Sequence, residues 1–198
     1  MTWPFDTLTP GAYGLILADP PWKYEMRSEA GHGRSPERHY RTLPTEEICA
    51  LPVHELAAPD CLLVLWSTWP HLLHAQRVMR AWGFRYVTGG AWTKRYRSGA
   101  PAMGGGFIFR STTEPYLVGT AGSPWIGTKS ERNYLETIEA VVEEGIDGLR
   151  RGHSRKPPEI RAMCERLAPA VARCELFATE PWSGADVWGD QIGKWGTP

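Results

Sequence analysis

Short apolar runs recur along the chain and predict the buried strands of a sheet. They lie at residues 13–18, 61–66, 86–92, 114–119 and 173–178. The first run stops where two prolines follow it, because proline has no N–H to offer to a sheet. Residues 137–142 fit either a further strand or a short helix, and the pattern does not separate the two.

Apolar residues at helical spacing predict helices between these runs. Residues 72–82 carry apolar side chains three or four positions apart, and Gly83 closes this helix. Residues 160–167 repeat the spacing directly after a Pro-Pro-Glu start, with a proline suited to the first helical position. A shorter helix begins near Thr45 and is interrupted by Pro52.

The order of these elements predicts an α/β fold. A strand at 61–66, a helix and a strand at 86–92 make a βαβ unit, for which we expect parallel pairing of the two strands. A length of 198 residues suits one domain, with boundaries at residues 1–198.

Two long segments interrupt the pattern and are predicted to serve a binding site. Residues 23–43 are rich in charge and glycine and leave directly from the first strand, which favours a substrate lid or binding loop over a mere connector. Residues 98–113 are rich in glycine, but no strand-to-helix context surrounds them, so a dinucleotide signature does not fit. We expect a mobile flap there.

The tetrapeptide Asp19-Pro20-Pro21-Trp22 sits at the carboxyl end of the first strand, where ligands bind in open α/β sheets. A carboxylate and a rigid backbone carbonyl are both acceptors, and together they can take the two hydrogens of an exocyclic NH2 group. The indole can stack on the ring that carries this group. The pattern predicts recognition of a planar amine, and the alternative is a strand-ending turn that happens to contain tryptophan.

Charge and cysteine content limit the choice of partners. The formal net charge is zero, so any contact with a polyanion has to come from local clusters of cations. The four cysteines form no CxxC pair, and Cys61 and Cys174 lie inside predicted strands as core thiols. No signal peptide or membrane span is predicted, which favours a cytoplasmic protein. His71 and His74 lack a third ligand at a sensible spacing, so no metal is expected.

The motif resembles the catalytic motif of amino-group methyltransferases. The chain is similar to the adenine-N6 family typified by the catalytic subunit of the eukaryotic messenger-RNA N6-methyladenosine writer, which has compact bacterial and phage members. Segments similar to that family follow in the same order at residues 39–42, 46–48, 65–68, 91–94, 114–119, 154–160, 165–167 and 175–178.

The resemblance implies a Rossmann-like methyltransferase fold in permuted order, with the catalytic strand first and the cofactor strand last. It implies S-adenosylmethionine as cofactor, and it assigns cofactor contacts to Asp19, Lys156, Phe177, Ala178, Thr179, Asp190 and Gln191. In the family an arginine usually stands at the position of Thr179, and an asparagine at that of Asp190. These two departures predict a modest cofactor affinity.

The function implied is methylation of the exocyclic amine of adenine in nucleic acid, with Asp19, Pro20, Pro21 and Trp22 as catalytic residues. DNA is favoured over RNA because the chain carries no appended zinc or RNA-binding module. RNA, cytosine-N4 transfer, and a catalytically silent scaffold remain alternatives, and a homodimer or a partner subunit stays open. Expected substrate contacts are Tyr24, Tyr40, Lys94, Arg95, Arg97 and Glu114. Further cations expected to border the same crevice are Arg27, Arg34, Arg38, Arg41, Arg150, Arg151 and Arg155.

Overall fold

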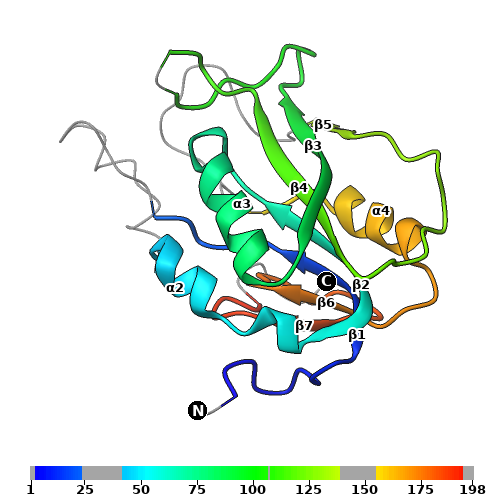
Figure 1. Cartoon of the computed structure of the whole chain (residues 1–198). Helices are drawn as coiled ribbons and strands as arrows, with labels where there is room; N and C mark the ends of the chain where they lie inside the picture. The colour runs from blue at the N-terminus through cyan, green and yellow to red at the C-terminus, as the bar shows by residue number, and fades with distance from the viewer. Residues whose placement is uncertain (1–2, 24–41, 107, 139–154, 194–198) are drawn as a thin grey trace.

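In the part of the chain that the structure describes, seven strands form one mixed sheet (Figure 1). The structure is a computed structural model and describes residues 3–23, 42–106, 108–138 and 155–193. The strand order is β5-β3-β4-β2-β1-β6-β7. The strands are β1 (Tyr13–Ala18), β2 (Ala57–Trp66), β3 (Arg85–Arg95), β4 (Thr113–Ala121), β5 (Tyr134–Ile138), β6 (Arg173–Leu176) and β7 (Asp186–Trp188).

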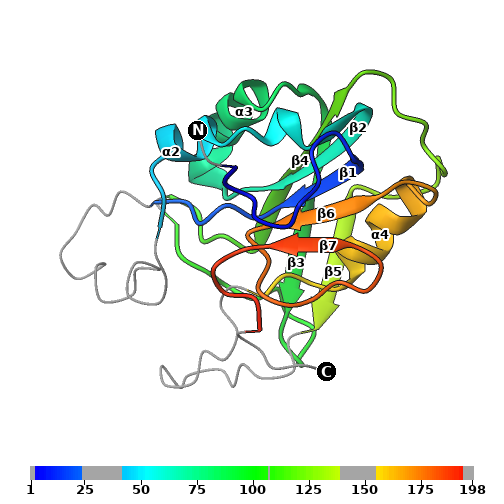
Figure 2. The ribbon, with the colours of Figure 1, turned by 90° about the horizontal axis from the view of Figure 1, so that it is seen from below.

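Helices cover both faces of this sheet. Helices α2 (Thr45–Ala50) and α3 (Leu72–Ala81) pack on one face, and α4 (Glu159–Leu167) packs on the other (Figures 1 and 2). Two 3₁₀ turns, η2 (Val53–Glu55) and η3 (Trp69–His71), complete the connections before and after β2. The chain therefore forms a three-layer α/β arrangement, as the sequence pattern predicts.

Side chains alternate along the central strand β1 between two buried clusters. Ile16 belongs to the cluster beneath α2 and α3, which includes Met79 and Trp82. Leu15 and Leu17 point to the opposite cluster, beneath α4. Because both faces of β1 are buried, every residue of this strand is apolar or small, which is why its sequence is a continuous apolar run rather than an alternating one.

The strand order corrects one prediction. β2 and β3 do not pair, although they run in the same direction, because β4 lies between them and is antiparallel to both. Gly119 of β4 is opposite Leu63 of β2 and Tyr86 of β3. A Cβ atom at Gly119 would come within 2.7 Å of Met79 Sδ, so the glycine allows α3 to cross close over this inserted strand.

The remaining element predictions agree with the structure where it describes them. Residues 137 and 138 belong to β5, and the rest of the ambiguous segment at 137–142 lies outside the described residues. Cys61 and Cys174 are buried and reduced, as expected for core thiols. Among the described residues, no helix is long and apolar enough to cross a membrane.

Candidate active site

The carboxyl ends of β1, β2, β6 and β7 meet at one edge of the sheet because these strands are parallel. Asp19 is the first residue after β1, and its backbone N–H donates to the carbonyl of Leu176 at 3.2 Å. β4 runs in the opposite direction, so Glu114, near its start, lies at this same edge. The sheet topology thus gathers residues from both ends of the chain around Asp19.

A tight turn fixes the backbone that follows Asp19. The N–H of Trp22 donates to the Pro20 carbonyl at 2.9 Å, and the N–H of Leu43 donates to the Pro21 carbonyl at 2.8 Å. Proline holds φ near −65° at two successive positions, so little freedom remains in this segment. The Asp19 side chain therefore leaves the sheet edge in a defined direction.

The Trp22 indole is buried, which differs from the expected position of a base-stacking ring. Only 5% of its surface is exposed. Its N–H donates to the Trp66 carbonyl at 3.2 Å, and its ring stacks on His71 with centroids 5.7 Å apart. His71 is held in turn by Thr68 and by the Lys23 carbonyl, at 2.9 Å each. In this conformation Trp22 anchors the turn to the core.

Trp69 is an exposed aromatic residue at this edge that the sequence analysis did not single out. Half of its surface is exposed, and its indole N–H donates to the Thr113 hydroxyl at 2.9 Å. It follows β2 in the turn η3, one residue before Pro70. One tryptophan among ten carries no sequence signal that would separate it from the buried ones.

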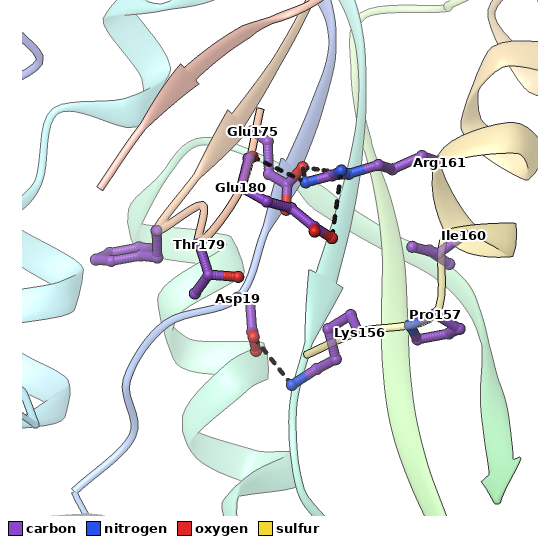
Figure 3. A pocket seen from close by; sticks show the side chains of 9 residues that line it. Asp19, Lys156, Pro157, Ile160, Arg161, Glu175, Thr179 and Glu180 are labelled. Carbon is purple, nitrogen blue, oxygen red and sulfur yellow. Dashed lines mark hydrogen bonds and ion pairs between the residues drawn. The ribbon is translucent and has the colours of Figure 1, made fainter. Parts of the chain in front are cut away.

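A row of alternating charges starts at Asp19. The Lys156 ammonium lies 2.9 Å from Asp19 Oδ2 (Figure 3). It also lies 3.4 Å from Glu114 Oε2. Lys94 lies 3.1 Å from Glu114 Oε1, so the row continues along β3. Lys156 also lies 5.4 Å from the centre of the Trp66 ring. The row thus joins two predicted cofactor residues, Asp19 and Lys156, to two predicted substrate contacts, Glu114 and Lys94.

The row sets the charge state of its two carboxylates. Burial raises the pKa of Asp19, and the neighbouring Lys156 partly opposes this rise. Burial also acts to raise the pKa of Glu114, but Lys156 and Lys94 together outweigh it, so the pKa of Glu114 is lowered. Glu114 therefore stays ionised, whereas Asp19 is the more easily protonated of the two.

A small pocket lies beside Asp19, and residues at the end of β6 line one side of it (Figure 3). Phe177 has a positive φ of 63°, and its ring meets Trp188 edge-on with centroids 5.3 Å apart. The Ala178 N–H donates to the Trp188 carbonyl at 2.9 Å, which ties the ends of β6 and β7 together. The pocket is lined by Asp19, Lys156, Pro157, Ile160, Arg161, Glu175, Phe177, Thr179 and Glu180.

The close approach between the ends of β6 and β7 requires a glycine. A Cβ atom at Gly189 would lie 2.8 Å from the nitrogen and 2.7 Å from the oxygen of Ala178. Asp190 and Gln191, two predicted cofactor residues, follow this glycine directly. They lie at the same sheet edge as Thr179, whose carbonyl accepts a hydrogen bond from Gly193 at 3.2 Å.

Arg161 and Glu175 form a buried ion pair at the floor of the pocket that the sequence analysis missed. The Arg161 Nε–H donates to Glu175 Oε2 at 2.8 Å, and two further N–H groups donate to the carbonyls of Glu180 and Pro181. Burial raises the pKa of Glu175 to about 7 even though Arg161 opposes the rise. A charged residue between the buried Cys174 and Leu176 of β6 was the available signal.

The predicted substrate cations differ in the contacts that they make. Lys94 belongs to the row of charges, whereas Arg95 pairs with Glu136 and donates to the Gly99 carbonyl at 2.8 Å. Arg97 is exposed. Arg155 pairs with Glu180 at 2.8 Å. The other predicted contacts lie outside the described residues: Tyr24, Arg27, Arg34, Arg38, Tyr40, Arg41, Arg150 and Arg151.

Known proteins similar to this chain share one kind of activity in their names. The sequence profile described as MT-A70 matches residues 13–191. The type II methyltransferase M.MunI of a Mycoplasma species is 31% identical over 206 residues, which cover 95% of this chain and 81% of that protein. The human N(6)-adenosine-methyltransferase catalytic subunit METTL3 is 29% identical over 169 residues, which cover 84% of this chain and 26% of that protein.

A fungal protein is also similar to nearly the whole of this chain. The N6-methyladenosine RNA methyltransferase MTA1 of Cryphonectria parasitica is 28% identical over 197 residues, which cover 94% of this chain and 53% of that protein. This chain thus spans most of M.MunI, about half of the fungal protein and about a quarter of the human one. The matched segment contains the Asp19 turn, the row of charges, and the ends of β6 and β7 beside the pocket. The chain belongs to the MT-A70 family.

Proposed function

We propose that this chain transfers a methyl group from S-adenosylmethionine to the exocyclic amine of adenine in DNA. The observation that carries the proposal is the position of Asp19. It stands at a fixed turn beside the ends of β6 and β7. Its backbone N–H donates to the Leu176 carbonyl, and its carboxylate faces Lys156. Membership of the MT-A70 family and the names of its relatives support this chemistry.

The residues around the pocket fit the cofactor. Its methionine end carries both a carboxylate and an ammonium, and the pocket offers the Lys156 cation together with the Asp19 and Glu180 carboxylates. Phe177, Ala178 and Thr179 would line its ribose, and Asp190 and Gln191 would hold its adenine. When bound, the cofactor supplies an electrophilic methyl group on a positively charged sulfonium.

Asp19 and the Pro20 carbonyl hold the target amine. The carboxylate accepts one hydrogen of the NH2 group, and the Pro20 carbonyl accepts the other through the lone pair that Trp22 leaves available. This arrangement directs the nitrogen lone pair out of the base plane, toward the pocket. As the new N–C bond forms, the S–CH3 bond of the sulfonium would break and leave a neutral thioether. The adjacent carboxylate stabilises the positive charge that develops on the nitrogen until the nitrogen releases one of its two protons.

DNA is the substrate we propose, and RNA is the second candidate. The coverage of M.MunI, at 81% of its length, favours a substrate like that of a type II methyltransferase. The similarity to an RNA methyltransferase over 94% of this chain is the observation that supports the alternative. Both candidates use the same residues at the amine.

Methyl transfer from radiolabelled S-adenosylmethionine to DNA and RNA pools of matched sequence tests the proposal. We expect N6-methyladenine in the DNA pool, identified by mass spectrometry of nucleosides. Asp19→Asn should abolish transfer, whereas cofactor binding, measured by calorimetry, should be largely retained because Lys156 and Glu180 still line the pocket. Asp60→Asn is the matched control, because Asp60 lies toward the opposite end of β2, where it accepts a hydrogen bond from the Ser123 N–H at 2.7 Å.

Three outcomes would contradict this assignment. Transfer retained in Asp19→Asn would remove the catalytic role of the carboxylate. Methylated cytosine alone would assign the cytosine-N4 reaction. No saturable heat with S-adenosylmethionine would favour a silent scaffold over an enzyme.

A further inference from the structure

Among the described residues of the connection between β3 and β4, a hydrogen-bonded turn presents two adjacent exposed apolar side chains. The Gly104 N–H donates to the Ser111 carbonyl at 2.7 Å, and the Ser111 N–H donates to the Gly105 carbonyl at 3.0 Å. A Cβ atom at Gly106 would overlap the Phe109 carbonyl oxygen, so the turn requires glycine there. Ile108 and Phe109 lie on this turn, and we call the two side chains the tip pair.

The tip pair is almost fully open to solvent. Ile108 is 89% exposed and Phe109 is 85% exposed. Single exposed apolar residues are common on protein surfaces, but these two are adjacent and are carried by a turn that hydrogen bonds hold in place. The Ser111 hydroxyl, which donates to the Thr113 carbonyl at 2.8 Å, fixes the base of the turn to the start of β4. Such a pair has a defined position from which to contact a partner.

The tip lies on the same side of the sheet as Asp19. The pairing of β3 with β4 ends at Thr93 and Thr113. From there the connection between the two strands extends away from the sheet, at the top of Figure 1. Glu114, next to Thr113, contacts Lys156, which contacts Asp19. Phe109 and Glu114 are five positions apart in the sequence, a span of at most about 18 Å.

The charge around the tip pair indicates what kind of partner it meets. Arg110 follows the pair directly, and Arg97 lies on the same connection; both are exposed. An apolar pair next to exposed guanidinium groups suits a partner with apolar bases inside and phosphates outside. A purely apolar protein surface would leave these two charges without a match.

We propose that Ile108 and Phe109 form a wedge that enters the base stack of duplex DNA and holds it open while the target adenine turns toward Asp19. This inference rests on the proposed function. The amine of a paired adenine is inside the duplex, so the base has to leave the stack before Asp19 can contact it. Apolar side chains inserted between base steps favour this opening by replacing the lost stacking contacts.

Single-stranded and double-stranded forms of one DNA test the wedge. The substrates are a single-stranded circular DNA and its double-stranded form, which have the same sequence on the common strand. We expect the double variant Ile108→Ala with Phe109→Ala to lose at least about tenfold of kcat/KM on the duplex, because unstacking a base step costs a few kcal/mol. On the single-stranded form its kcat/KM should stay within about twofold of wild type, because the bases are far less constrained.

Trp125→Ala is the matched control. Trp125 is 72% exposed and follows β4 at the opposite edge of the sheet, so its removal takes away a large exposed apolar side chain without touching the tip. It should leave kcat/KM unchanged on both DNA forms. Phe109→Leu, which keeps an apolar side chain, should retain most of the duplex activity.

Two results would overturn the wedge. Wild-type activity of the double variant on the duplex would show that the tip pair takes no part in opening it. An equal loss on both forms, with a change in molecular mass by light scattering, would assign the tip to a protein contact. A wild-type chain that methylates neither DNA form would instead contradict the proposed substrate, and with it any wedge in DNA.

Discussion

The Lys156 ammonium lies 2.9 Å from the Asp19 carboxylate, which is the group that we propose as a hydrogen-bond acceptor for the adenine amine. Lys156 is also 3.4 Å from Glu114, so it can shift from one carboxylate to the other without losing an ionic partner. Glu114 is held by Lys94 as well and stays ionised. This relationship makes the charge of Asp19 depend on two neighbours that act in opposite directions.

Lys156→Met should move the acid side of the pH–rate profile to higher pH. Asp19 has to be ionised to accept the amine, so activity falls as pH drops through its pKa. Burial already raises that pKa, and Lys156 is the main group that lowers it again. Removing this cation raises the pKa further. The profile of kcat/KM against pH measures the shift; a uniform drop at every pH would indicate a merely structural effect.

Glu114→Gln should move the same limb in the opposite direction. The Glu114 charge raises the pKa of Asp19, so its loss lowers that pKa and extends activity to more acidic conditions. The rate at the optimum should fall, because Lys156 then has Asp19 as its remaining carboxylate in the row and competes with the amine. Shifts of the same sign in Glu114→Gln and Lys156→Met would contradict this account of the row.

Glu175→Gln should remove a pH dependence of stability. Burial raises the pKa of Glu175 from 4.5 to about 7, so the folded state holds this proton more tightly than the unfolded state. The resulting stability is present below pH 4.5 and is lost as pH rises to about 7, a change of roughly 3 kcal/mol. Thermal unfolding of wild type and variant between pH 4.5 and 8 measures the difference.

The exposed Glu55→Gln is the control for this comparison. It should follow the wild-type curve at every pH. If Glu175→Gln also follows that curve, the Arg161 ion pair keeps Glu175 ionised in the folded state throughout.

The sequence predicts those parts of the fold that depend on local pattern. β1 is predicted to the residue because six apolar residues end at an Asp-Pro-Pro stop. Strand β6 and helix α4 are found because each carries a local burial pattern, consecutive in β6 and at helical spacing in α4. Asp19 is singled out because its motif is short and contiguous.

The parts that sequence reasoning missed depend on contacts between distant segments. The insertion of β4 between β2 and β3 follows from sheet pairing, which apolar runs do not encode. The direction of the Trp22 ring depends on the Trp66 carbonyl and on His71, which lie more than 40 residues away at and after the end of β2. Lys156 could be linked to Glu114 only once β4 was known to run antiparallel.

Trp22→Phe should change mainly the stability of the fold, whereas Trp69→Ala should change mainly the KM for DNA. The Trp22 indole is buried and donates to the Trp66 carbonyl, so Phe at this position should lower the free energy of unfolding by about 1–3 kcal/mol. The KM for DNA should change little. Trp69 is half exposed at the site edge, so Trp69→Ala should raise that KM. A stacking contact with a base is worth about 1–3 kcal/mol. A large rise of KM in Trp22→Phe at unchanged stability would restore the base-stacking role to Trp22.

Arg97 and Arg95 should differ in how their loss affects DNA binding at different salt concentrations. Each phosphate contact adds about 0.9 to the slope of log K against log salt concentration. Arg97 is exposed, so Arg97→Ala should flatten this slope by about one contact. Arg95 pairs with Glu136 and with the Gly99 carbonyl, so Arg95→Ala should leave the slope unchanged and loosen the β3–β5 edge instead.

Fluorescence anisotropy with a labelled duplex at several salt concentrations measures the slopes of both variants. Calorimetry with S-adenosylmethionine is the control, because neither arginine lines the cofactor pocket and cofactor affinity should stay the same. An equally reduced slope in both variants would mean that Arg95 leaves Glu136 when DNA binds. An unaltered slope in Arg97→Ala would mean that other residues hold the phosphates.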